Sequence, residues 1–158
     1  MSTIEFKETT KLTPEQYTAG LTDFGPGRKQ LFGNSDDGYL KVHSQGPTEA
    51  DVTEGSAGVW ERLQYDWSDP NKVVAKTTDS NTYGGNSGHT YTYTRNPDGT
   101  TTIDYVVVRD GKNVKGRFLG WVLGSIGKGR LDTAFKNSIK AIEARDGAAS
   151  TPDAPEPT

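Results

Sequence analysis

The sequence predicts an α+β fold in which a curved antiparallel sheet of about six to seven strands wraps around a long C-terminal helix. Three observations lead to this prediction. Residues 39–109 form a succession of alternating segments separated by turn-forming residues. Residues 116–145 then change to a helical period, and a single strand and a short helix precede both regions. The length of 158 residues favours one domain.

The first elements are read from local patterns. Apolar residues alternate with charged ones over residues 3–10, which predicts a strand. The run Thr13-Pro14-Glu15-Gln16 is typical of a helix start with a capping box, so we expect a short helix from Pro14 to about Asp23. One more helical turn is predicted over residues 28–32.

The middle of the chain reads as strands joined by tight turns. The separators are rich in glycine, proline, asparagine and aspartate, which favours an antiparallel meander. The predicted strands cover residues 39–45, 51–54, 58–67, 72–78, 88–95 and 101–109.

The last predicted element is an amphipathic helix over residues 116–145, with a kink at Gly127 and Gly129 and an end at Gly147. We expect the folded domain to span residues 1–146. Residues 147–158 are rich in alanine, serine, proline and acidic residues, and we expect a disordered tail there. Glycines at positions 116, 120 and 124 share one helix face, which either leaves space for the sheet or a ligand or marks a weak helix start.

Composition restricts the classes of function. The net charge is −3, so no global basic field would attract nucleic acid or an anionic membrane. The absence of cysteine excludes disulfides, thiolate metal sites and cysteine nucleophiles. The chain shows no signal-peptide pattern and no run of about 18 apolar residues. We therefore expect a soluble, cytoplasmic protein with no nucleic-acid partner and no membrane span.

This layout resembles the helix-grip fold of the START/Bet v 1-like superfamily, also called the SRPBCC or polyketide cyclase/dehydrase-like group. The resemblance spans residues 3–145, and none of its carriers is a catalytic signature. It implies a cavity between sheet and helix, usually for an apolar or amphipathic ligand, in a family that also includes ring-closing and dehydrating enzymes and members with no known ligand. The carriers are Ile4-Glu5-Phe6-Lys7, the helix at Pro14, residues 64–73 and residues 115–120.

The turn Asn96-Pro97-Asp98-Gly99 sets the register of the last predicted hairpin. A type I turn followed by a left-handed Gly99 pairs Asn96 with Thr100, which places Tyr91 opposite Tyr105. The more apolar face of this hairpin is assigned to the helix side. That face carries His89, Tyr91, Tyr93, Ile103, Tyr105 and Val107.

The same alternation orients two neighbouring strands. In residues 58–67 the inward set is Val59, Glu61, Leu63, Tyr65 and Trp67. In residues 39–45 the inward set is Leu40, Val42 and Ser44, which turns Lys41 and His43 outward.

The inward tyrosines suit an amphipathic ligand, because tyrosine combines an apolar ring with a polar tip. Ordinary core packing with the hydroxyls at the rim gives the same pattern, and the sequence leaves both interpretations open. We expect a cavity of several hundred Å³ if the ligand interpretation holds. The candidate ligand-binding residues are Tyr65, His89, Tyr91, Tyr93, Ile103, Tyr105, Val107, Phe118, Trp121 and Val122.

The candidate catalytic residues are His89 and Glu61, because histidine titrates near neutrality and a buried carboxylate can be tuned. The alternative is a rim histidine and a glutamate paired at the surface. His43 lies far from His89 in the sequence, so no metal site is expected, and no cofactor is expected. The glycine-rich residues 84–88 lack the lysine and the following helix of a phosphate-binding loop, so we expect a mobile hairpin loop.

Three functions remain open. The leading one is binding of an apolar or amphipathic small molecule, lipid- or polyketide-like, in a cavity between sheet and helix. The second is a cyclase- or dehydratase-like enzyme that uses pocket acid–base residues. The third is an interaction protein with a filled core, in which the outward Trp60 marks a partner or dimer patch. We expect a monomer or a weak homodimer.

Overall fold

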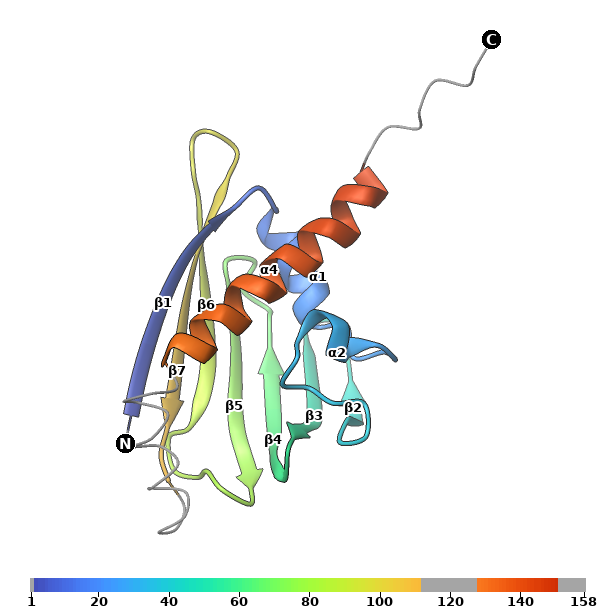
Figure 1. Ribbon diagram of the computed structural model, residues 1–158, viewed down its shortest axis with the longest axis vertical. Coiled ribbons are helices and arrows are strands. Elements are labelled where there is room, and N and C mark those ends of the chain that lie inside the picture. The colour runs from blue at the N-terminus through green and yellow to red at the C-terminus, as the bar shows by residue number, and fades with distance from the viewer. Residues whose placement is uncertain (1, 112–127, 151–158) are drawn as a thin grey trace.

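The computed structural model describes residues 2–111 and 128–150, which contain seven strands and three helices (Figure 1). The elements, in chain order, are β1 (Ser2–Thr10), α1 (Pro14–Leu21), α2 (Arg28–Leu31), β2 (Lys41–Gln45), β3 (Glu49–Ser56), β4 (Val59–Asp66), β5 (Lys72–Ser80), β6 (Gly88–Arg95), β7 (Thr101–Arg109) and α4 (Lys128–Ser150).

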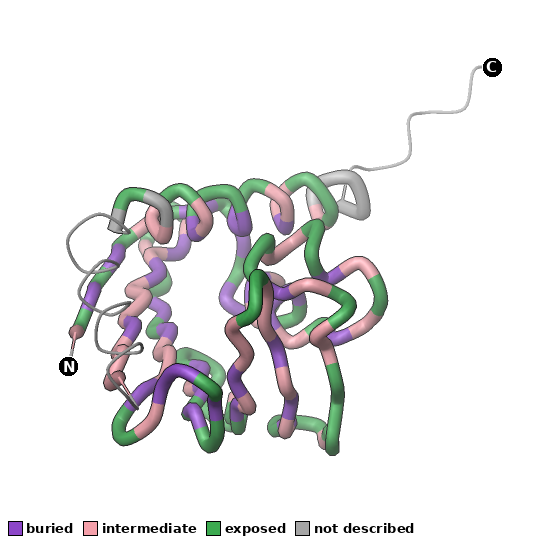
Figure 2. The backbone as a smooth tube through the Cα atoms, turned by 60° about the horizontal axis from the view of Figure 1, so that its bottom comes forward, coloured by how far each residue is buried: buried purple, intermediate pink, exposed green. Residues whose placement is uncertain are grey.

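The strands form one antiparallel sheet in the order β1-β7-β6-β5-β4-β3-β2. Figure 1 shows α4 crossing one face of this sheet diagonally, from the β1 and β7 side toward α1. Figure 2 shows α4 above the strands, along which buried and less buried positions alternate. The predicted α+β fold, a curved antiparallel sheet wrapped on a C-terminal helix, is confirmed.

Local signals set the first helix. Thr13 accepts a hydrogen bond from the Gln16 backbone at 3.1 Å, and the Gln16 side chain accepts one from the Thr13 backbone at 2.8 Å, so the predicted capping box is present. The helix ends at Leu21, somewhat before the predicted Asp23. A Cβ atom at Gly20 would lie 2.7 Å from the tip of Ile142, so this glycine lets α1 pack closely against α4.

The β6–β7 hairpin has the predicted register. Tyr91 pairs with Tyr105, and the remaining pairs follow the same count from the turn. Gly99 has φ +87°, the left-handed conformation that the three-residue loop requires. The side chains assigned to the helix-facing side of this hairpin therefore do share one face.

The core lies between the concave face of the sheet and the helices. Phe135, Ile139 and Ile142 of α4 are buried at the predicted helical spacing. The Phe135 ring lies 5.1 Å from that of Tyr105 and 6.2 Å from that of Phe6, measured between ring centroids. These aromatic contacts join the helix to β7 and β1.

One edge strand and one loop differ in detail from the sequence analysis. Val42 pairs with the buried Val52 and so faces inward as predicted, but it is 40% exposed because β2 is an edge strand. Ser44 pairs instead with the outward Asp51, because the pairing shifts register between Val42 and Ser44. The glycine-rich loop before β6, whose mobility stays a prediction, is bonded to the end of β7. The Ser87 hydroxyl, which is buried, accepts the Asp110 backbone N–H at 2.7 Å, and Tyr83 forms a bridge with Gly111.

The C-terminal helix continues to Ser150 rather than ending at Gly147, because nothing in the following alanines stops it. Residues 112–127 lie outside the described residues, so the predicted kink and the ligand candidates Phe118, Trp121 and Val122 are not described. Within residues 2–111 and 128–150, no helix combines the length and hydropathy needed to cross a membrane.

Candidate functional site

An aromatic stack runs along the inner face of the β6–β7 hairpin. The rings of Tyr91 and Tyr105 are nearly parallel, with centroids 4.4 Å apart and an interplanar angle of 4°. His89 continues the stack on the other side of Tyr105, at 5.9 Å and 10°. The hairpin register produces this arrangement, because it sets the two tyrosines directly opposite one another on adjacent strands.

A polar cluster adjoins this stack at the end of the sheet below α4. Glu61 of β4 forms an ion pair with Arg109 of β7 at 2.8 Å, and its second oxygen lies 3.9 Å from His89 Nε2. His89 Nδ1 and the Tyr105 hydroxyl are 2.7 Å apart. Thr77 donates to the same Glu61 oxygen that faces His89, at 2.9 Å. We call Glu61, His89, Tyr105 and Arg109 the polar pole.

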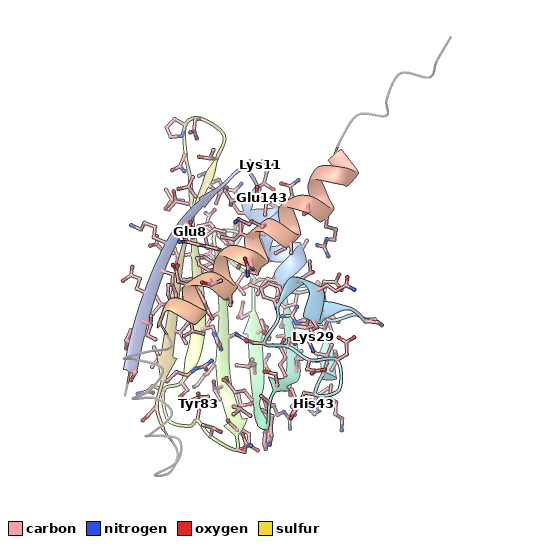
Figure 3. The ribbon with its side chains drawn as sticks, viewed as in Figure 1. Glu8, Lys11, Lys29, His43, Tyr83 and Glu143 are labelled. Carbon is pink, nitrogen blue, oxygen red and sulfur yellow. The ribbon has the colours of Figure 1, made fainter. Side chains whose placement is uncertain are left out.

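The curvature of the sheet assembles the polar pole. Glu61 and Arg109 come from β4 and β7, which two other strands separate in the sheet order. Their side chains meet because both point to the concave face. The Arg109 guanidinium also lies over the ring of Tyr83, 4.5 Å from its centroid. Figure 3 places Tyr83 at the end of the sheet remote from Lys11 and Glu143.

The environment holds His89 neutral. Burial, and secondly the positive charge of Arg109, lower the pKa of His89 from 6.5 to about 3. Arginine only donates hydrogen bonds, and Arg109 lies 3.4 Å from His89 Nε2. Nε2 is therefore the acceptor nitrogen, and Nδ1 carries the proton that it donates to Tyr105. Burial also raises the pKa of Tyr105 to about 12, although Arg109 opposes that rise.

A second buried ion pair lies near α1 and α2. Arg28 donates through Nε to Glu54 at 2.6 Å, and through Nη1 to the carbonyl oxygens of Leu21 and Asp23 at 2.7 and 2.9 Å. The hydroxyls of Ser35 and Tyr65 also donate to Glu54. We call Arg28, Ser35, Glu54 and Tyr65 the Arg28 cluster.

The Arg28 cluster is enclosed by aromatic rings. The guanidinium lies between Phe24 and Phe32, 4.7 and 4.8 Å from their ring centroids. Burial by itself lowers the pKa of Arg28, but the Glu54 carboxylate reverses this, and the net pKa is raised. Burial is also the main cause that raises the pKa of Tyr65, followed by the Glu54 charge. The bonds of this cluster join the C-terminal end of α1 to β3, which is a structural role.

The predicted ligand-binding residues fall into groups of different accessibility. Ile103 and Val107 are fully buried, and so form the wall behind the stack rather than an accessible surface. The hydroxyls of Tyr65 and Tyr93 are engaged by protein groups, the second by Thr18 at 2.9 Å. The predicted ligand-binding residues whose polar atoms belong to the polar pole are His89 and Tyr105. The ligand-binding role itself stays a prediction for all of them.

The two candidate catalytic residues, His89 and Glu61, do lie together, and both side chains are largely buried. Neither is a rim or surface group. The outward assignment of His43 also holds, since it is exposed and bonds Thr53 at 2.8 Å. Among residues 2–111 and 128–150, no three histidine or acidic side chains converge to hold a metal ion.

Sequence reasoning missed Arg109, Arg28 and Glu54. Two of them carried a signal. Arg109 follows the inward Val107 by two residues, so the same alternation places it inward. Glu54 likewise follows the buried Val52 on β3. Arg28 carried no such signal, because Phe24 and Phe32 indicate its burial only once the structure shows where they lie.

Two hollows of the described surface lie away from these tyrosines. One, of about 440 Å³, is open to solvent between α1 and the loops that follow β2 and β4. A smaller one, of about 210 Å³, adjoins the β6–β7 turn. Neither is lined by a predicted ligand-binding residue.

Neither a protein-family model nor a curated protein matches the sequence. Solved structures do match. A protein from Thermus thermophilus aligns with a TM-score of 0.70 and 14% identity, over 95% of this chain and 100% of that chain. The Zhui aromatase/cyclase from a Streptomyces species aligns with a TM-score of 0.69 and 14% identity, over 96% of this chain and 99% of that chain. A START superfamily protein from Mycobacterium smegmatis aligns with a TM-score of 0.65 and 11% identity, over 94% of this chain and 99% of that chain.

At these identities the likeness establishes architecture, and it covers nearly the whole length of this chain and of each neighbour. The sheet order, the short helices after β1 and the C-terminal helix on the concave face agree with it. The chain therefore has the START/Bet v 1-like helix-grip fold.

Proposed function

We propose that the protein binds an amphipathic small molecule of lipid- or polyketide-like chemistry on the concave face of the sheet, beneath α4. The observation that carries this proposal is the Glu61–Arg109 ion pair beside the aromatic stack. A filled core gains little from such a pair, because well-packed apolar side chains of similar volume often stabilise a protein as well or better. Buried charges on a concave face are more typical of binding sites.

The polar pole is reachable. The side chains of His89, Glu61 and Arg109 keep 15%, 11% and 11% of their exposure, whereas Ile103 behind the stack has none. Water therefore touches these groups, and ligand atoms can replace that water. Among the described residues, Arg109 Nε and Nη2 have no hydrogen-bond partner, which leaves donors for a ligand oxygen.

The neighbouring aromatic side chains supply the apolar half of the site. Tyr91, Tyr105, Phe6 and Phe135 form connected ring contacts between β6, β7, β1 and α4. A ligand with an apolar body and one polar end would lie along these rings with its polar end at Arg109 and Glu61. The fold neighbours support this chemistry, because they include a START superfamily protein and an aromatase/cyclase.

The second candidate is an enzyme of cyclase or dehydratase type, and the closeness of Glu61 to His89 favours it. A histidine whose pKa is about 3 is unprotonated at neutral pH and is a weak base. In this alternative, Glu61 would be the proton acceptor and Arg109 would stabilise negative charge on a substrate oxygen. Loss of turnover in Glu61→Gln together with retention in His89→Gln would support it.

The third candidate, an interaction protein with a filled core, receives less support. Trp60 is half-buried, and the large apolar side chain that the described residues leave exposed is Val42 of the edge strand β2. No outward apolar patch forms around Trp60 within residues 2–111 and 128–150. The monomeric or weakly dimeric state stays a prediction.

The test is a titration with 2-naphthol, followed by NMR chemical shifts and by a dissociation constant. We expect the largest shifts at the polar pole and the Tyr91 ring, with outward residues such as Thr92 unaffected. Arg109→Gln should weaken binding about tenfold, which corresponds to loss of one charge-assisted hydrogen bond. Arg62→Gln is the matched control, because Arg62 pairs with Asp51 on the outer face at 2.7 Å. Shifts confined to the outer face, or equal effects of both variants, would overturn the proposal.

A further inference from the structure

The charges of the polar pole cancel. Glu61 and Arg109 are in contact at 2.8 Å and carry opposite charges, and burial together with Arg109 keeps His89 neutral. The neighbouring Arg28 cluster is balanced in the same way by Arg28 and Glu54. The two ion pairs therefore offer no net positive charge to a ligand on the concave face.

An anionic ligand would meet two obstacles at the polar pole. Its carboxylate would have to compete with Glu61 for the Arg109 guanidinium, and it would have to approach the Glu61 carboxylate itself. In a partly desolvated site, such like-charge contact is strongly unfavourable. Arg28 cannot pair with the ligand's carboxylate instead, because its side chain is 2% exposed and is enclosed by Glu54, two carbonyl oxygens and two aromatic rings.

A hydroxyl group fits the same atoms better. Arg109 has donors without partners among the described residues, and a ligand oxygen can accept from them. The Glu61 carboxylate can accept further hydrogen bonds beyond those from Arg109 and Thr77. A hydroxyl both accepts and donates, whereas a carboxylate only accepts.

We propose that the polar pole selects ligands with a neutral hydroxyl or phenol end over otherwise similar ligands that end in a carboxylate. This inference rests on the proposed function and narrows its ligand class to neutral alcohols and phenols. Glu61 is the residue that sets the preference, because it neutralises the charge of Arg109 and repels a second carboxylate.

The test compares two matched pairs of probes, 2-naphthol with 2-naphthoate and 1-decanol with decanoate, at neutral pH. We expect the wild-type protein to bind each hydroxyl compound at least about tenfold more tightly than its carboxylate partner. Glu61→Gln keeps the side-chain shape and frees the Arg109 charge, so we expect it to raise carboxylate affinity about tenfold and to abolish or reverse the preference. Asp51→Asn removes one negative charge on the outer face and should leave the preference unchanged.

The outcomes separate the two proposals. If neither member of either pair shifts the polar pole, the proposed function fails. If both members bind there and the carboxylate binds equally well or better in the wild type, only the inference about ligand charge fails. The same holds if Asp51→Asn changes the preference as much as Glu61→Gln. Because the wild-type comparison needs no variant, the inference stays testable even if Glu61→Gln does not fold.

Discussion

The two buried ion pairs on the concave face differ in how completely the protein surrounds them. Arg28 and Glu54 are held by carbonyl oxygens, hydroxyls and two phenylalanine rings, so the hydrogen bonds of this pair lie within the protein. Among the described residues, Arg109 and Glu61 contact fewer groups, and their side chains keep 11% of their exposure. The first arrangement stabilises the fold, and the second leaves hydrogen-bonding capacity for a ligand. Burial of charge alone therefore does not distinguish a structural pair from a site, and the exposure that the arginine side chain keeps, 2% for Arg28 and 11% for Arg109, does.

The largest expected difference between the two pairs is in stability. Arg28→Gln should lower the free energy of unfolding by about 3–5 kcal/mol, because it leaves Glu54 buried without its countercharge. Arg109→Gln should cost less than half as much, since the Arg109 side chain keeps 11% of its exposure against 2% for Arg28, and Arg28 also holds the carbonyl oxygens of Leu21 and Asp23. Urea unfolding of both variants measures this. Equal losses would show that the two pairs contribute alike to the stability of the fold.

The tyrosines of the two clusters provide a smaller version of the same comparison. Tyr65→Phe removes a donor to the buried Glu54 carboxylate and should cost about 1.5–3 kcal/mol. Tyr105→Phe removes a bond to the neutral His89 and should cost about 0.5–1.5 kcal/mol. Thermal unfolding of the two variants measures which one loses more stability. A larger loss for Tyr105→Phe would contradict the structural role assigned to the Arg28 cluster.

The low pKa of His89 predicts acid sensitivity at the polar pole. The unfolded chain takes up a proton on this residue below pH 6.5, and the folded protein resists it until about pH 3. Stability should therefore fall as the pH decreases through this window, with a slope of up to about 1.4 kcal/mol per pH unit from this residue.

The groups that face His89 are Glu61 of β4 and Arg109 and Tyr105 of β7, with Glu54 of β3 acting at longer range. Replacing His89 with Gln should flatten the decline in the free energy of unfolding between pH 7 and pH 5. This range lies above the pH at which free carboxyl groups usually titrate. Urea unfolding at several pH values measures it. An unchanged slope in the variant would mean that His89 titrates normally.

The smallest effect is expected for an exposed pair. Arg95 and Glu15 lie 2.5 Å apart, but their side chains are 48% and 61% exposed. Arg95→Gln should leave the free energy of unfolding almost unchanged, because solvent screens the pair. This variant sets the baseline for both buried pairs, and a loss comparable to that of Arg109→Gln would remove the distinction between surface and polar pole.

Much of the fold follows from local patterns in the sequence. The capping box at Thr13 and Gln16 and the turn at Gly99 were readable because the signal lies within a few residues. The inward prediction for Ser44 failed because alternation assumes regular pairing, and a bulge on an edge strand breaks it. The bonds of the loop containing Ser87 could not be predicted, because they go to Asp110, which is distant in the chain.

By itself, the sequence determined the order of the elements, the register of the β6–β7 hairpin and the inward face that carries His89, Tyr91 and Tyr105. These depend on period and turn chemistry, which are local. Only the tertiary structure decided that Glu61 meets Arg109, since sheet curvature joins strands that are not neighbours. It also decided that the Arg28 side chain is 2% exposed between two aromatic rings while Arg109 keeps 11% of its exposure, because enclosure depends on groups contributed by several elements at once.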